Sequence, residues 1–228
     1  MVQRDYILRL IEQLGPGAAA LLRSAEQRKG HQYREAGRTI DQALRQTFGL
    51  DSEAVRGLSA EELVALIGLG RSARLGSEVF GEKLILLASL LGEQADLDAA
   101  QNDPEGSAAC ALKSLQLFLT AITGEAAIDS LSADRAAAAI ESLLPRLAAY
   151  ELPTTAKRQL WQHYERSGAF ANAEDWLFAL LDDDPAALPD GIAFYDRLAR
   201  YTDQELARGN LPRDEVASGR AELRARQG

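Results

Sequence analysis

Apolar residues recur at steps of three and four along most of this 228-residue chain. The clearest run follows Asp103 and Pro104 and consists of Ala108, Ala111, Leu112, Leu115, Phe118, Leu119 and Ile122. Because an α-helix turns once in about 3.6 residues, this spacing places the apolar side chains on one face, which must be buried. Composition agrees, since 40 Ala and 36 Leu stand against only 21 Val, Ile and Thr. Those β-branched residues favour sheets, so the sequence predicts an all-α fold of packed helices.

Several helices can be placed by their stripes and their end signals. One begins near Tyr6 and is kinked at Gly15 and Pro16, and a second spans about residues 31–48 and stops at Gly49. A capping box of Ser59 and Glu62 signals a third, whose predicted buried face is Leu63, Leu66 and Ile67. Residues 79–99 are apolar almost all round, which predicts a central helix with neighbours on several sides.

Short polar or Pro- and Gly-containing links separate these helices from later ones. Further helices are predicted to start at Ser132, at Pro153 with Thr154, at Ala169, at Pro189 and at Pro212. No link is long or biased enough for a flexible tether. We therefore predict a single domain over residues 1–228, in which residues 1–50, 51–150 and 151–228 are candidate sub-units.

An internal repeat is visible near the C-terminal end. Its residues are Leu160, Trp161, Tyr164, Gly168, Phe170, Ala173, Leu177, Leu180, Leu181 and Pro185. This order resembles the tetratricopeptide repeat over residues 154–185, and it departs from that repeat at Trp161, where a small residue is usual. The same spacing recurs at Tyr33, Ala36, Ile40, Ala43 and Leu44. The resemblance implies antiparallel helix pairs stacked as a helical repeat or bundle.

The arrangement is also similar to a family of uncharacterised bacterial proteins. The similarity rests on Arg4-Asp5-Tyr6-Ile7 with Ile11-Glu12, on the helix of Tyr33 and Ala36, and on Leu58-Ser59-Ala60-Glu61-Glu62-Leu63. It implies no activity, because that family has none assigned.

The tetratricopeptide resemblance also implies a place for a partner. In that family the inner surface of the first helix of each pair holds peptides, which here corresponds to Arg158, Gln162, Glu165 and Arg166. These side chains suit a polar or mixed-charge segment. The alternative interpretation is a solvated helix face with no partner.

Other candidate sites have simpler interpretations. The stretch Gly68, Gly70 and Ala73 imitates a dinucleotide-binding loop, but that loop follows a strand, whereas a helix cap precedes these glycines. Cys110 lies near an apolar face and is predicted to be buried rather than nucleophilic, and the lone His163 is predicted to be partly exposed. Asp184 before Pro185 is predicted to be a cap and turn, with Asp182 and Asp183 in water.

Charge and motifs narrow the functional classes. The formal charge of −9, with no gathered basic face, disfavours nucleic acid and anionic membranes as partners. Two His, one Cys and no metal-binding motif predict no metal site, no catalytic residues and no cofactor. The start of the chain shows no leader pattern and no apolar run is long enough to cross a bilayer, so we expect a cytoplasmic protein of bacterial type.

The sequence therefore predicts a non-catalytic protein, either a protein–protein interaction module or a self-assembling helical scaffold. Its partner is predicted to be a protein or peptide, with a second copy of the chain as one option. The alternative is a helical ligand-binding protein or an enzyme whose polar groups converge only in three dimensions. An enclosed pocket lined by Trp161, Trp176 and the tyrosines would favour that alternative.

Overall fold

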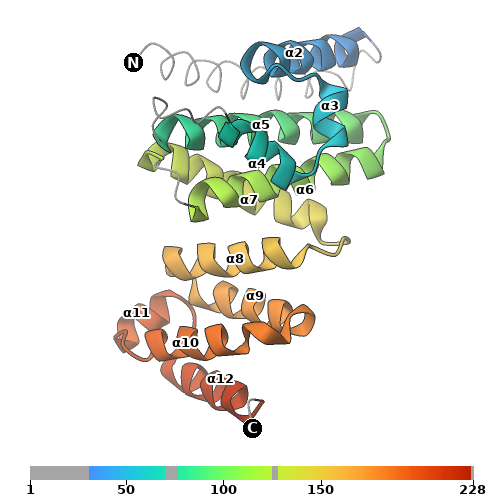
Figure 1. Ribbon diagram of the computed structural model, residues 1–228. Coiled ribbons are helices and arrows are strands. Elements are labelled where there is room, and N and C mark those ends of the chain that lie inside the picture. The colour runs from blue at the N-terminus through green and yellow to red at the C-terminus, as the bar shows by residue number, and fades with distance from the viewer. Residues whose placement is uncertain (1–30, 70–76, 125–127, 227–228) are drawn as a thin grey trace. The chain divides into compact units, whose positions relative to one another are not determined.

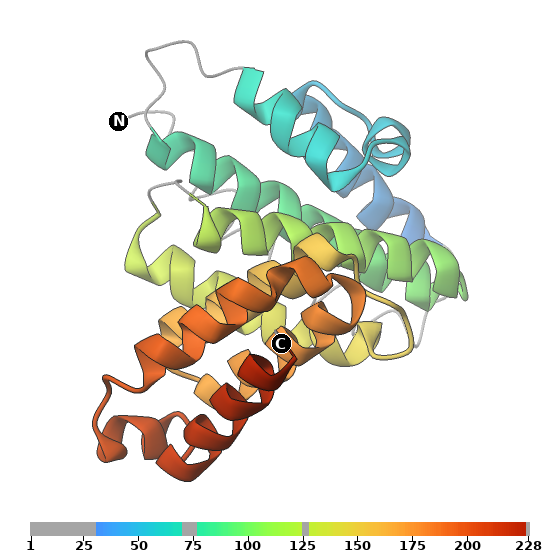
Figure 2. The same cartoon turned by 60° about the horizontal axis from the view of Figure 1, so that its bottom comes forward.

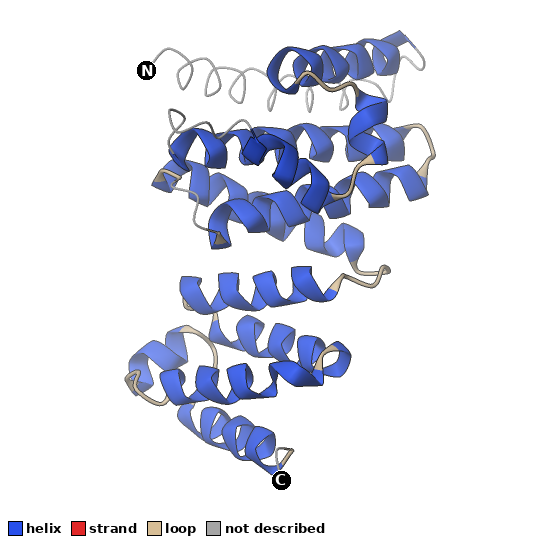
Figure 3. Cartoon of the chain, viewed as in Figure 1, coloured by secondary structure: helices blue, strands red, loops and turns tan. Residues whose placement is uncertain are grey.

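A computed structural model describes residues 31–69, 77–124 and 128–226 of the chain. Within these ranges the chain forms helices joined by turns, and no strand occurs among them (Figure 3). The prediction of an all-α fold is confirmed. The helix predicted from Tyr6, with its kink at Gly15 and Pro16, lies outside the described residues, as do Gly70 and Ala73.

The chain forms two compact units, Met1–Glu151 and Leu152–Gly228, which we call the N-terminal and C-terminal units. Each builds its own core. The prediction of a single domain over residues 1–228, with its three candidate sub-units, stays a prediction.

The N-terminal unit is built on two long helices that lie side by side and run in opposite directions (Figure 1). These are α5 and α6; α7 packs on α6, while α2 and α4 pack on α5. The helices of this unit are α2 (His31–Phe48), α3 (Ser52–Gly57), α4 (Ala60–Leu69), α5 (Ser77–Ala100), α6 (Pro104–Thr123) and α7 (Ser130–Leu147).

The central helix predicted at residues 79–99 is α5. The six apolar side chains in its middle are buried on every side, none more than 3% exposed: Leu84, Ile85, Leu86, Leu87, Leu90 and Leu91. A polar contact joins it to α6, since the buried Ser114 hydroxyl donates to the Ala88 carbonyl at 2.7 Å. A helix with apolar residues all round requires neighbours all round, and α2, α4, α6 and α7 supply them.

The predicted helix starts are largely confirmed. The Asp103 carboxylate accepts the Gly106 amide at 2.9 Å with Pro104 as first helical residue, and Ser59 and Glu62 make both bonds of a capping box, at 3.1 and 2.7 Å. The start of α7 was predicted two residues late. Asp129 accepts the Ser132 amide at 2.8 Å, so the helix begins at Ser130.

One residue predicted to be buried on α4 is exposed. Leu63 and Ile67 are buried, with 0% and 7% of their surface exposed, but Leu66 is 37% exposed. Since successive helical residues are about 100° apart around the axis, Leu66 lies at the margin of the stripe that Leu63 and Ile67 define.

The C-terminal unit is a succession of shorter helices (Figure 2). The pair α8 and α9 packs closely, and α10 packs against α12. A helix at residues 203–208 was not predicted. The elements are α8 (Thr154–Ser167), α9 (Phe170–Asp183), the 3-10 turn η2 (Pro185–Ala187), α10 (Leu188–Leu198), α11 (Asp203–Arg208) and α12 (Arg213–Ala225).

The repeat-like residues form the contact between α8 and α9 and the core around it. Leu160, Tyr164, Phe170, Ala173, Leu177, Leu180 and Leu181 are all buried, and Gly168 turns the chain between the helices at a φ of 79°. Trp161 is buried at 4% exposure and meets Phe194 of α10 edge to face, with ring centroids 6.0 Å apart. The bulky Trp161 is thus accommodated against α10, where its ring adds apolar contact.

A polar contact joins α9 to α10 beneath α12. The Tyr195 hydroxyl donates to Glu174 at 2.5 Å. Burial raises the pKa of the Glu174 carboxyl above its ordinary 4.5, the Tyr195 bond opposes this, and Glu215, Asp175 and Glu222 add to it. The net effect is that the folded unit disfavours the charged carboxylate.

This contact predicts a pH dependence of the C-terminal unit. In the folded unit the Glu174 carboxyl keeps its proton to higher pH than it does in the unfolded chain. The contribution of Glu174 to the free energy of unfolding therefore falls as the pH rises above about 4.5 and through the folded pKa. Glu174→Gln is therefore expected to raise the urea midpoint at pH 7 and to match the wild type at pH 4. Tryptophan fluorescence measures it, because Trp161 and Trp176 both lie in this unit. Asp182→Asn, at an exposed position of the same helix, is the control. An equal rise of the urea midpoint in both variants would contradict the raised pKa of Glu174.

Candidate functional site

Four residues predicted to face a partner lie along one side of α8. Steps of four, three and one place Arg158, Gln162, Glu165 and Arg166 on adjoining turns of the same helix face. The first three are half-buried and Arg166 is exposed. We call these four residues the α8 stripe.

Two members of the α8 stripe form ion pairs within the C-terminal unit. Arg158 donates through Nη1 to Asp190 Oδ2 and through Nη2 to Asp184 Oδ2, both at 3.0 Å. Glu165 accepts both Nε and Nη2 of Arg197, at 2.6 and 2.8 Å. This bidentate bond raises the pKa of Arg197.

The two pairs have matching spacing on α8 and α10. Arg158 and Glu165 are seven residues apart, as are Asp190 and Arg197, so these two members of the stripe are both tied to α10. The sequence did not reveal these pairs, because each partner lies 32 residues away. They fix the orientation of the charged side chains, while the Asp190 side chain remains 60% exposed and can accept further donors.

Gln162 lies between the two ion pairs along the stripe. Its amide offers both donors and an acceptor, which suits the backbone of an extended peptide. Arg166 adds a cation at the exposed end. The stripe can therefore contact a polar segment of mixed charge by hydrogen bonds, without bond-making or bond-breaking chemistry.

Cys110 is buried at 2% exposure, as predicted. Burial raises the pKa of its thiol to about 11, with Arg56 and Lys113 opposing the shift and Asp98 adding to it. The thiol is therefore protonated near neutral pH and unsuited to nucleophilic attack.

The remaining candidate motifs are placed as follows. The residues before Gly68 form α4, a helix rather than the strand that a dinucleotide loop requires. His163 is half-buried beside the Tyr164 ring, 5.1 Å between centroids.

The acidic run at residues 182–184 is as predicted. Asp184 caps η2 by accepting the Ala186 amide at 3.2 Å. Asp182 and Asp183 are both exposed. Asp183 also pairs with Lys157 at 2.5 Å, a contact between α9 and α8 that was not predicted. In the described part of the chain, no group of three His, Cys, Asp or Glu side chains could hold a metal ion.

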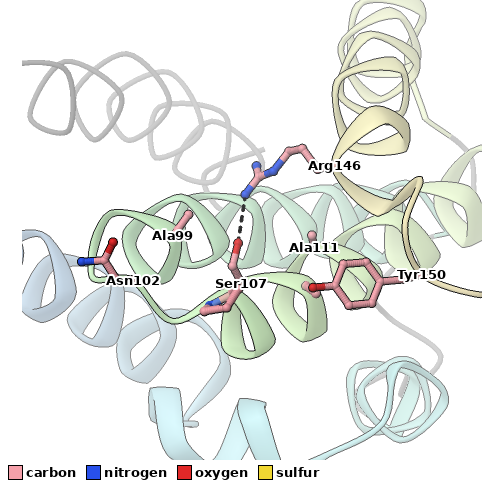
Figure 4. Close-up of a pocket in the computed structure, with 8 residues that line it drawn as sticks. Ala99, Asn102, Ser107, Ala111, Arg146 and Tyr150 are labelled. Carbon is pink, nitrogen blue, oxygen red and sulfur yellow. Dashed lines mark hydrogen bonds between the residues drawn. The ribbon is translucent and has the colours of Figure 1, made fainter.

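A cavity of about 470 Å³ lies in the N-terminal unit, and none of its lining residues belongs to the α8 stripe. It opens where the end of α5, the start of α6 and the end of α7 meet (Figure 4). Its lining residues are Ala99, Asn102, Pro104, Ser107, Ala108, Ala111, Arg146 and Tyr150. No tryptophan lines it, so it differs from the pocket considered from the sequence.

The whole chain, residues 1–228, matches the family described as "Family of unknown function (DUF6483)", and the chain belongs to that family. No curated protein matches it, and no solved structure does. Over residues 31–69, 77–124 and 128–226, no helix has the length and apolar character needed to cross a membrane.

Proposed function

We propose that this member of a family of unknown function is a non-catalytic protein–protein interaction module that binds a polar, mixed-charge peptide segment along the α8 stripe. The proposal rests on one observation: Arg158 and Glu165 of the stripe are held in fixed positions by ion pairs to Asp184, Asp190 and Arg197. A surface whose side chains are ordered before binding loses less conformational entropy when a partner arrives. Its setting is the tetratricopeptide-like pair of α8 and α9, in which α8 is the first helix.

Charge and geometry suggest how the segment is held. Gln162 can bond the peptide backbone, Arg166 can pair with an acidic side chain, and the exposed carboxylate of Asp190 can accept a basic one. These contacts need no cofactor, and we propose none. We propose neither nucleic acid nor a membrane as a partner, since the charge of −9 opposes both.

The outer surface of α12 favours a module over a self-assembling scaffold. Its exposed residues are mostly charged or polar: Arg213, Asp214, Glu215, Ser218, Glu222 and Arg224. Helical repeats stack through apolar faces, and a polar outer face limits further stacking. A second copy of the chain therefore ranks behind a different protein as the partner.

Affinity capture with a matched pair of variants tests the proposal. Gln162→Ala with Arg166→Ala removes two stripe side chains without breaking the ion pairs to α10. Gln204→Ala with Arg208→Ala removes the same residue types, at the same spacing, from the exposed residues of α11. We expect the stripe variant to lose the captured partner by about tenfold while the α11 variant keeps it.

The result that contradicts the proposal is equal capture by both variants. Light scattering of the purified chain tests whether the partner is a second copy of the chain. A dimer that the stripe variant converts to monomer identifies the second copy as the partner, whereas an unchanged dimer leaves the stripe free for another protein.

A further inference from the structure

The cavity at the junction of α5, α6 and α7 has a lining with one charged side chain. That side chain is Arg146, and the other seven lining residues include no acid. Asn102, Ser107 and Tyr150 add an amide and two hydroxyls. A partly open cavity with one cationic side chain and several neutral hydrogen-bonding groups suits a small anion with a single negative charge.

Arg146 also forms an ion pair with an acid that does not line the cavity. Its Nη1 pairs with Asp96 Oδ1 at 2.6 Å. Its Nη2 reaches Ser107 Oγ at 3.4 Å, which is long for a hydrogen bond (Figure 4). One side of the guanidinium is thus fixed, while the side that faces Ser107 is weakly satisfied and can exchange that bond for a carboxylate oxygen.

The rest of the cavity is apolar and formed by small residues. Ala108 and Ala111 of α6 lie one helical turn apart. Ala99, near the end of α5, and Pro104, the first residue of α6, lie on either side of the turn that joins these helices. Alanines leave space that larger apolar side chains would fill. Tyr150, 45% exposed, borders this space with its ring, which suits contact with an apolar or aromatic body.

We propose that this cavity binds a small monocarboxylate with an apolar body. The carboxylate contacts Arg146 and the Ser107 hydroxyl, and the body lies against Ala108, Ala111 and the Tyr150 ring. A volume of about 470 Å³ is within the range of ligand pockets. This binding is independent of the α8 stripe, so either proposal can fail alone.

Titration of the isotope-labelled full chain with hydrocinnamate, followed by NMR, tests the binding. We expect saturable shifts of the Ser107, Ala108 and Ala111 amides with a Kd on the order of 1 mM. Hydrocinnamide has the same shape without the charge and should bind about tenfold more weakly, because it cannot form the charge-assisted bonds. Shifts that do not saturate, or that fall outside the lining, overturn the proposal, as does equal affinity for the acid and its amide.

Variants separate the two halves of the site. Ala108→Leu fills the apolar space and should weaken hydrocinnamate binding about tenfold, as should Arg146→Gln. Arg135→Gln removes the same charge from an exposed position on α7 and should leave the affinity unchanged. Circular dichroism checks that each variant is helical. If a variant does not fold, the comparison of hydrocinnamate with hydrocinnamide on the unaltered chain still tests the proposal. Equal binding by Ala108→Leu and Arg135→Gln contradicts the site.

Discussion

We expect Arg56→Met to lower the free energy of unfolding of the N-terminal unit by about 3 kcal/mol. Arg56 pairs with Asp98 at 2.5 Å, and the Asp98 side chain is only 6% exposed. Asp98 Oδ1 also accepts Gln94 Nε2 at 2.8 Å. Without the guanidinium, a buried carboxylate keeps only neutral donors, the Gln94 amide and the Cys110 thiol, and a buried charge without a counter-charge is costly. Urea unfolding followed by far-ultraviolet circular dichroism measures the change.

Two further variants test the cause of this loss. Arg38→Met, at an exposed position of α2, should change the unfolding free energy by less than about 0.5 kcal/mol. Arg56→Met combined with Asp98→Asn should recover part of the loss, because the buried charge is gone. If the free energy of unfolding of Arg56→Met lies within about 1 kcal/mol of the wild-type value, the buried ion pair does not hold α3 to α5 as we describe.

We expect Gly219→Ala to destabilise the C-terminal unit by about 2 kcal/mol, although the same change usually stabilises a helix. A Cβ at this position of α12 would lie 2.5 Å from Tyr195 Cζ and 2.8 Å from Cε1. The Tyr195 ring cannot move aside easily, since it is fully buried and its hydroxyl is bonded to Glu174. Helix α12 would have to shift away from α10. The tryptophan fluorescence transition in urea reports this unit directly.

Gly37→Ala is the matched comparison in a helix without that obstruction. A Cβ there would meet Leu97 Cδ2 at 3.5 Å, an ordinary contact. Alanine is favoured over glycine inside a helix by up to about 1 kcal/mol, so this variant should be more stable than the wild type. Effects of the same sign in the two variants would contradict the packing of α12 on Tyr195.

The long helices could be predicted because each carries several turns of one-sided apolar spacing and a recognisable end. Helix α6 has its Asp103 cap, and α2 stops at Gly49 with a φ of 71°. Helix α11 was not predicted, since its six residues hold too few apolar positions to show a period. Its start did carry a signal: Thr202 and Glu205 form a capping box, with the Glu205 amide bonded to Thr202 Oγ1 at 3.3 Å.

The candidate sites were predictable only in part. Local spacing put Arg158 and Glu165 on one face of α8, but their partners Asp190 and Arg197 come from a helix that packs nearby only after folding. The cavity depends on space left by Ala108 and Ala111 beside α7. Sequence does not distinguish these alanines from others that fill their surroundings, such as the fully buried Ala136.

Site-specific photocrosslinking in cells that produce the protein tests the central claim, that the α8 stripe holds a protein partner. Gln162 is replaced by benzoylphenylalanine in one sample and Gln204 in another, so that the same probe is placed on α8 and on α11. We predict a discrete crosslinked protein from position 162 and none from position 204. The absence of a product at position 162, or the same product from both positions, would contradict the account.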